Sequence, residues 1–300
     1  MFYRSLWKSI ISLICFLSFT FTLFSQTKKA GEDSTNYITF HRVDNAWNLS
    51  KGKGVTVAVL DWLFDLSPEA SKKYIEPVSL VPGQDIGINK PWHGEWMAEI
   101  IHKIAPEAKI IPIRTRPNRK KDDDQKEEPN YQKYLVKGIK YAADHGASFI
   151  TNSMGPVKQT AELDEAVKYA AGKGAVFIDV HPEYVRKEND QITFCNSSQL
   201  NDMIIHCGIV SVPDYPVEPD TLRDFFTWPY DIAPVFKDGW GYSNGPPITA
   251  GIAALVKSVN PELKGSNIKK ILIETSEIRN GFKILNAEKA VKETEKRFNK

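Results

Sequence analysis

The sequence GWGYSNGPPITAGIAAL, residues 239–255, begins as a glycine-rich turn and continues as an apolar helix with many small residues. Ser243 stands where the turn meets the predicted helix. At the first turn of a helix several backbone N–H groups have no partner within the helix, and the helix dipole favours negative charge. A nucleophilic hydroxyl would be well placed there. A serine in this position is more commonly a helix N-cap, so Ser243 alone does not decide between the two roles.

The first 25 residues have the pattern of a secretory signal peptide. Arg4 and Lys8 form a positive start, residues 10–24 are an apolar run, and Ser25 is a small residue suited to cleavage. The apolar run is shorter than the ~20 residues of a membrane-spanning helix, so a cleaved signal is favoured over an uncleaved anchor. We therefore expect export to the periplasm, the cell surface or the extracellular space, with no membrane attachment after the signal is removed.

The rest of the chain carries balanced charge. The full sequence has 39 basic and 37 acidic residues, and removal of Arg4 and Lys8 leaves 37 of each (39 − 2 = 37 basic). This balance gives no argument for a nucleic-acid partner. The roughly 275 residues that remain are enough for one large domain with a substantial core. We expect residues 26–44 to be a flexible lead-in and residues 45–300 to form this domain.

Two cysteines, Cys195 and Cys207, remain after the signal. In an exported protein they can form a disulfide, although Cys207 lies in an apolar run and would equally suit a buried thiol. No cysteine and histidine residues have the spacing of a zinc site, and the acidic residues of the mixed-charge run 116–129 are interleaved with basic ones. The sequence therefore predicts no metal site and no cofactor.

Short apolar runs alternate with helical patterns along the chain. Continuously apolar strands that are separated by helices are typical of a parallel sheet covered on both faces. We therefore predict a three-layer α/β/α domain with a mainly parallel central sheet. The strands are expected at residues 54–60, 109–114, 148–152, 175–180 and 203–212, and the helices at residues 92–104, 131–145, 161–173, 247–259 and 267–275.

Polar residues stand at the ends of several predicted strands, where sheets of this kind bind their ligands. Asp61 ends the first strand, Asn152 and Ser153 end the third, and a turn beginning at His181 follows the fourth. His93 opens the first predicted helix. Taken singly, an aspartate at a strand end suits a turn cap, and a histidine at a helix start suits a surface position.

Asp61, His93 and Ser243 together have the composition of a hydrolytic triad. Serine supplies the oxygen nucleophile, histidine takes its proton, and aspartate orients the imidazole and stabilises its charged form. The spacings are 32 residues from Asp61 to His93 and 150 residues from His93 to Ser243. The chain order of Asp, His and Ser is that of the subtilisin-type proteases.

Three segments resemble motifs of the subtilisin-like serine proteases. They are VAVLD ending at Asp61, HGEWMAEII beginning at His93, and GYSNGPPITAGIAALV around Ser243. A fourth segment, ITNSMG, resembles the one that binds the substrate backbone and borders the specificity pocket. The resemblance covers about residues 45–286 and implies four substrate-binding residues: Asn152, Ser153, Met154 and Gly155.

The chain also departs from these motifs. Trp62 and Leu63 stand where the family has small residues, Trp96 where it has a second histidine, and Glu99 where it has a glycine. Tyr242 and Asn244 stand where the family has Thr and Met beside the serine. The turn after residue 180 lacks the asparagine whose side chain donates a hydrogen bond to the oxyanion in the family. Loss of such a donor costs on the order of 10² to 10³ in rate, an effect known from subtilisin itself. His181 is our candidate for a substitute oxyanion donor.

Two interpretations follow from the sequence. In the first, the protein is an exported serine endopeptidase that hydrolyses peptide bonds in protein or peptide substrates through Asp61, His93 and Ser243. In the second, it is a catalytically weak or inactive pseudoprotease that binds proteins, as the altered motifs and the missing asparagine would suggest. A third and weaker interpretation, an unrelated α/β binding protein, requires the three residues to lie far apart.

Overall fold

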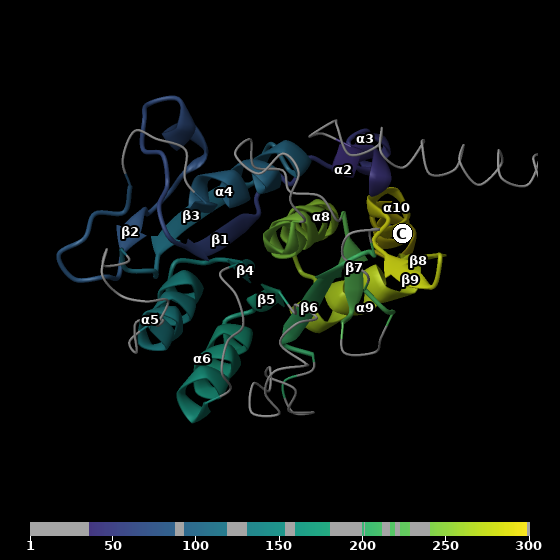
Figure 1. Ribbon diagram of the computed structural model, residues 1–300. Coiled ribbons are helices and arrows are strands. Elements are labelled where there is room, and N and C mark those ends of the chain that lie inside the picture. Colours follow the sequence, from purple (N-terminus) through teal and green to yellow (C-terminus); the bar gives the residue numbers. More distant parts are fainter. Residues whose placement is uncertain are drawn as a thin grey trace, which may run out of the picture.

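The computed structural model describes residues 36–87, 93–118, 131–153, 160–180, 202–211, 217–219, 223–228 and 241–298, together with Leu200. Within these residues a sheet of nine strands is covered by helices on both faces (Figure 1). The predicted three-layer α/β/α architecture with a mainly parallel sheet is confirmed.

The order of the strands places β1 (Thr56–Asp61) at a switch point of the sheet. The order is β2-β3-β1-β4-β5-β6-β7-β9-β8, and neighbouring strands are parallel except in the β8–β9 hairpin. The chain runs from β1 to β3 on one side and then crosses to β4 on the other, so a ligand site is expected beyond their carboxyl ends. The other strands are β2 (Val78–Ser79), β3 (Lys109–Arg114), β4 (Phe149–Asn152), β5 (Val176–Val180), β6 (Ile204–Ile209), β7 (Phe225–Thr227), β8 (Glu277–Arg279) and β9 (Phe282–Ile284).

Alternate residues of the central strands face different helix layers. Val57 and Val59 of β1 belong to the core cluster that includes residues of α4 and α8, whereas Ala58 and Leu60 belong to the cluster of α5 and α6. Figure 1 shows these two pairs of helices on opposite faces of the sheet. Burial on both faces explains why the strands are continuously apolar. The helices are α4 (His93–Ile104), α5 (Tyr131–Asp144), α6 (Ala161–Gly172), α8 (Gly245–Val259), α9 (Gly265–Thr275) and α10 (Ala287–Phe298), and the 3₁₀ turns are η1 (Ala70–Lys73) and η2 (Tyr242–Asn244).

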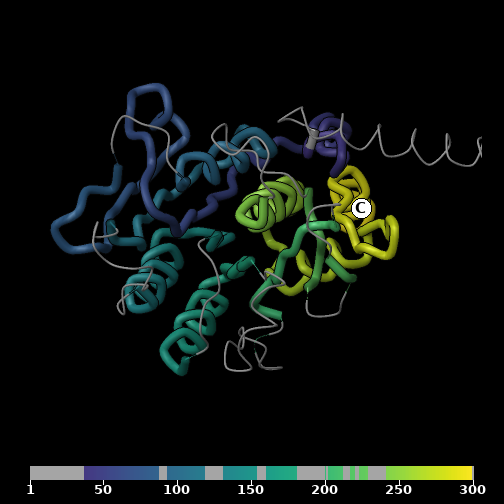
Figure 2. Tube along the Cα trace, in the orientation of Figure 1, coloured from purple at the N-terminus to yellow at the C-terminus, as the bar shows by residue number. Residues whose placement is uncertain are grey.

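The start of the described chain packs against its end. We expected a flexible lead-in up to residue 44, but α2 (Asn36–Phe40) and α3 (Val43–Ala46) are helical, and Tyr37 within them is fully buried. Figure 2 shows this purple segment beside the yellow α10, and the backbone N–H of Ala287 donates to the carbonyl of His41 at 2.8 Å. Helices this short show no periodicity in the sequence, so only the tertiary contacts reveal them. The predicted signal, residues 1–25, lies outside the described residues.

Most predicted elements match the structure to within a few residues. The sequence missed β7, β8 and β9, which have only three residues each and too little pattern to be recognised. It also missed α10, a strongly charged helix whose apolar stripe is narrow. Of the helices that the structure describes, none is both long and apolar enough to cross a membrane.

Cys207 is a buried free thiol, which is the second of the two alternatives considered for it. Its Sγ lies 3.1 Å from the Oγ1 of Thr249 on α8. Burial raises the pKa of this thiol well above its ordinary value, so it stays protonated and unreactive. Cys195 lies outside the described residues.

Gly251 sets the distance between α8 and α4. A Cβ atom at this position would lie 2.8 Å from the Cβ of Ile104, closer than real Cβ atoms approach. We expect Gly251→Ala to lower the free energy of unfolding by about 1–3 kcal/mol, because the added methyl group overpacks the helix contact. Denaturant unfolding measures this change.

Gly172 is the matched control, because it also lies in a helix but a Cβ there would meet nothing within 4 Å. Gly172→Ala should leave stability unchanged or raise it by up to about 1 kcal/mol. Equal losses in the two variants would contradict a packing role for Gly251.

Candidate active site

Asp61 is the last residue of β1 and is fully buried. Its Oδ1 accepts a hydrogen bond from the backbone N–H of Trp62 at 2.6 Å. Its main-chain carbonyl accepts from the backbone N–H groups of Thr115 and Arg116 at 2.9 and 3.3 Å. Main-chain contacts on both sides therefore fix the carboxylate at the carboxyl edge of the sheet.

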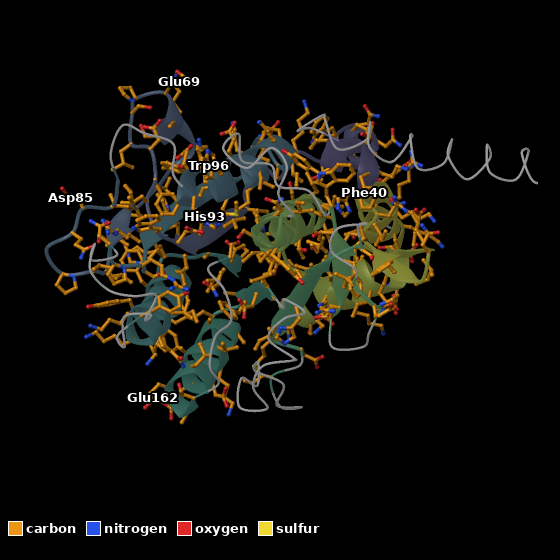
Figure 3. The ribbon with its side chains drawn as sticks, viewed as in Figure 1. Phe40, Glu69, Asp85, His93, Trp96 and Glu162 are labelled. Carbon is orange, nitrogen blue, oxygen red and sulfur yellow. The ribbon has the colours of Figure 1, made fainter. Side chains whose placement is uncertain are left out.

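His93 is the first residue of α4 and lies against Asp61. Its Nδ1 is 2.8 Å from Oδ1 and 2.9 Å from Oδ2 of the carboxylate, and its side chain is 23 % exposed. Figure 3 labels His93 at the beginning of this helix. A carboxylate accepts hydrogen bonds, so Nδ1 carries the hydrogen in this contact. In the neutral imidazole the other ring nitrogen, Nε2, is then the basic one.

Ser243 lies in η2, immediately before α8. Its Oγ donates a hydrogen bond to the main-chain carbonyl of Ser153 at 3.1 Å. Ser153 directly follows β4, the neighbour of β1, and Leu60 of β1 is paired with Asn152 of β4. The structure therefore places the serine at the same edge of the sheet as the pair formed by Asp61 and His93.

The side chain of Asn152 faces the interior of the domain. Its Oδ1 accepts from the hydroxyl of Tyr131 at 2.9 Å, and its Nδ2 donates to Oδ1 of Asp179 at 2.9 Å. The side chain of Asn152 is thus engaged within the protein, and the whole residue is buried. Met154, Gly155 and His181, which we predicted as substrate-binding or oxyanion residues, lie outside the described residues.

Residues that differ from the family motifs find new local partners. The indole Nε1 of Trp62 contacts Oδ1 of Asn118 at 3.2 Å, and Trp96 packs against the core at the position labelled in Figure 3. Glu99 lies 3.2 Å from the ammonium group of Lys73. None of these contacts displaces His93 from Asp61, so the altered motifs are compatible with an intact pair.

Sequence reasoning missed a buried polar network beside this edge. Asp179, in β5, is only 2 % exposed and is linked through Asn152 to Tyr131. The guanidinium group of Arg116 lies 3.5 Å from the centre of the Tyr131 ring. The signal in the sequence was an aspartate within the apolar run AVFIDV. Burial raises the pKa of Asp179 to about 8, against the opposing effect of its hydrogen bonds.

The groups at this edge suit acyl transfer. A hydroxyl, an imidazole with one ring nitrogen held by a carboxylate, and that carboxylate are the parts that nucleophilic catalysis by serine needs. Within the described ranges, no three His, Cys, Asp or Glu side chains come together as ligands of a metal ion. The hydroxyl, the imidazole and the carboxylate can support proton transfer and nucleophilic attack.

The pKa of Asp179 leads to a prediction about stability. The pKa rises from 3.8 to about 8 on folding, so folding takes up a proton between these pH values. The stabilisation from the neutral form is complete below about pH 4 and is lost as the pH rises towards 8. Asp179→Asn has no such loss, so its stability relative to the wild type should increase from pH 4 to pH 8 in denaturant titrations.

Asp144→Asn is the control, because Asp144 is exposed and its contact with Tyr169 lowers the pKa of its carboxyl group. This variant should show no relative gain as the pH rises. A constant difference between Asp179→Asn and the wild type over the same pH range would contradict a neutral Asp179 carboxyl group.

Comparison with known proteins places this geometry in context. No family model matches the sequence. The chain is 24 % identical to thermitase of Thermoactinomyces vulgaris over 252 residues, which cover 77 % of this chain and 84 % of thermitase. It is 26 % identical to the thermophilic serine proteinase of Bacillus sp. (strain AK1) over 238 residues, covering 72 % of this chain and 55 % of the proteinase.

The fold matches solved structures over the same part of the chain. The MycP3 protease of the type VII (ESX-3) secretion system superposes with a TM-score of 0.66 at 20 % identity, covering 85 % of this chain and 87 % of MycP3. At this level of identity the match shows the fold alone, and the two sequence relatives show a distant similarity to serine proteases. The chain is therefore a distant relative of the subtilisin-like serine proteases and has their three-layer fold.

Proposed function

We propose that the protein is an exported serine endopeptidase that hydrolyses peptide bonds through Asp61, His93 and Ser243. The contact of 2.8 Å between the imidazole Nδ1 and the Asp61 carboxylate is the observation that carries this proposal. The contact gives the histidine the orientation and tautomer of a general base. The names of thermitase and of the thermophilic serine proteinase point to the same class of chemistry.

The proposed reaction has two steps. In the first, His93 Nε2 takes the proton of the Ser243 hydroxyl while Oγ attacks the peptide carbonyl, and the imidazolium then gives that proton to the leaving amine. In the second, His93 takes a proton from a water molecule that attacks the acyl group, and the imidazolium returns this proton to Ser243 Oγ as the acyl–oxygen bond breaks and the acid product leaves. Asp61 holds the imidazole throughout and stabilises its positive charge, which a buried carboxylate at hydrogen-bonding distance is suited to do.

Ser243 must change its hydrogen bond before it reacts. A carbonyl oxygen only accepts, so the single hydroxyl hydrogen of Ser243 is directed at Ser153 in the structure. A rotation of the side chain about its Cα–Cβ bond would release this hydrogen. One neutral hydrogen bond contributes only about 0.5–1.5 kcal/mol net, so the change is within easy thermal reach.

The substrate in this proposal is a protein or peptide bound in extended form. Its backbone would lie beside residues 153–155, with the main chain of Asn152 and Ser153 as part of the support. Met154 and Gly155 complete this predicted segment, and His181 remains the candidate oxyanion donor. The predicted signal peptide, residues 1–25, would direct the enzyme out of the cytoplasm.

The competing function is that of a pseudoprotease that only binds proteins. The hydrogen bond from Ser243 to Ser153 is the structural observation that favours it, because a hydroxyl held in this way is not directed at a base. The two functions differ in their need for the Ser243 oxygen. Catalysis requires this atom, whereas binding by the fold does not.

A fluorophosphonate probe distinguishes the two functions. The wild type should be labelled covalently at Ser243, because the probe reacts with serines activated by a base. Ser243→Ala should not be labelled, whereas Ser258→Ala, which alters a serine bound to the carbonyl of Lys53 far along α8, should be labelled like the wild type. A folded wild type that stays unlabelled under conditions that label thermitase would contradict the peptidase function.

Asp61→Asn probes the tautomer of His93. The amide can turn its NH₂ group towards Nδ1, which moves the imidazole hydrogen to Nε2 and removes the base. We expect kcat for cleavage of labelled casein to fall by about 10⁴, with an unchanged melting temperature as the check on folding. Asp65→Asn is the nearby control, since its Oδ1 only accepts from the backbone N–H of Ser67, and it should retain activity.

A further inference from the structure

Glu95 is a buried acid two residues after His93. It is 7 % exposed, and its Oε1 lies 2.7 Å from the ammonium group of Lys73, which is 8 % exposed. Its Oε2 accepts from the hydroxyl of Tyr74 and from the backbone N–H of Asp65 at 3.0 Å. We call the set formed by Glu95, Lys73 and Tyr74 the Glu95 clamp.

All partners of the clamp come from one segment, residues 62–76, that begins directly after Asp61. The backbone N–H of Glu95 also donates to the carbonyl of Leu63 in this segment at 3.2 Å. A Cβ atom at Gly94 would lie 2.7 Å from the same carbonyl oxygen, so the start of α4 is in close contact with the segment. The segment is thus attached to Asp61 through the chain and to His93 through the clamp.

The orientation of His93 needs such support. The first four N–H groups of a helix have no partner within the helix, so its first turn is held less firmly than its middle. His93 is the first residue of α4 and depends on contacts outside the helix. Glu95, in the same turn, supplies the contacts that the helix itself does not.

A gain in stability does not by itself explain the buried ion pair between Glu95 and Lys73. Removing two charges from water costs several kcal/mol per ion, and well-packed apolar residues in place of a buried pair are often neutral or stabilising. What the acid adds is direction, since three donors converge on its carboxylate: the Lys73 ammonium group, the Tyr74 hydroxyl and the Asp65 backbone N–H.

We propose that Glu95 is a positioning residue, and that its clamp on residues 62–76 holds His93 in register with Asp61. Its kinetic consequence rests on the proposed peptidase function, but its structural consequence does not. Loss of the clamp leaves the fold intact and loosens the contact between His93 Nδ1 and the carboxylate. A displacement of about 1 Å of a catalytic group is enough to cost about 10²-fold in rate.

The experiment replaces the ion pair between Lys73 and Glu95 with two apolar residues and compares this variant with the wild type. In the double variant Lys73→Met with Glu95→Leu, we expect a melting temperature close to that of the wild type. We expect kcat for labelled casein to fall about 10- to 100-fold with little change in KM. In ¹⁵N-histidine-labelled protein, the low-field resonance of the His93 Nδ1 hydrogen, identified by its absence in His93→Ala, should weaken or move upfield.

Two further variants separate positioning from general damage. Glu95→Gln keeps an oxygen for Tyr74 and Asp65 and should restore kcat to within a few-fold of the wild type. Glu99→Gln, one turn further on α4, alters an acid that also contacts Lys73 but is 41 % exposed, and it should leave kcat and the resonance unchanged. If the double variant does not fold, Glu95→Ala replaces it in the comparison with Glu95→Gln.

An unchanged kcat together with an unchanged His93 resonance in the folded double variant would overturn the proposal. The NMR measurement also keeps the clamp separate from the peptidase function. If the wild type neither cleaves casein nor reacts with a fluorophosphonate, the peptidase function fails. A loss of the His93 resonance in the double variant would still support the clamp.

Discussion

The central strands are apolar on both faces, and this requires one helix layer on each side of the sheet. The layer that contains α4 and α8 brings two helix starts over the same carboxyl edge, with His93 at the first and Ser243 just before the second. The close contact between Gly251 and Ile104 sets the distance between the two helices. The arrangement of the candidate site therefore follows from the packing of its supporting layer.

The same edge contains two buried carboxyl groups with different neighbours. Asp61 has an imidazole within 2.8 Å and a backbone N–H within 2.6 Å, so both of its charged oxygens have partners. Asp179 has an amide from Asn152 but no ion-pair partner among the described residues. Burial without a cation favours the neutral acid there. Two aspartates of similar burial are thus suited to different roles by their partners.

The low identity to thermitase is explained by what this fold requires of its sequence. The layers need apolar residues along the whole of each central strand and small residues at a few helix contacts, and many side chains satisfy both needs. Polar residues around the site are paired between segments that lie apart in the chain. Trp62 contacts Asn118, and Glu95 contacts Lys73, so each of these side chains has a polar partner on another segment.

The sequence by itself determined the layer architecture and most helices and strands, and it predicted the three residues of the candidate triad. It could do so because continuous apolar runs, helix periods and the order Asp61, His93, Ser243 are local or linear features. The tertiary structure alone decided that the Asn152 side chain meets Asp179, that Tyr37 is part of the core, and that Glu95 meets Lys73. These facts depend on contacts between segments far apart in the chain, and no local pattern in the sequence encodes the distance between them.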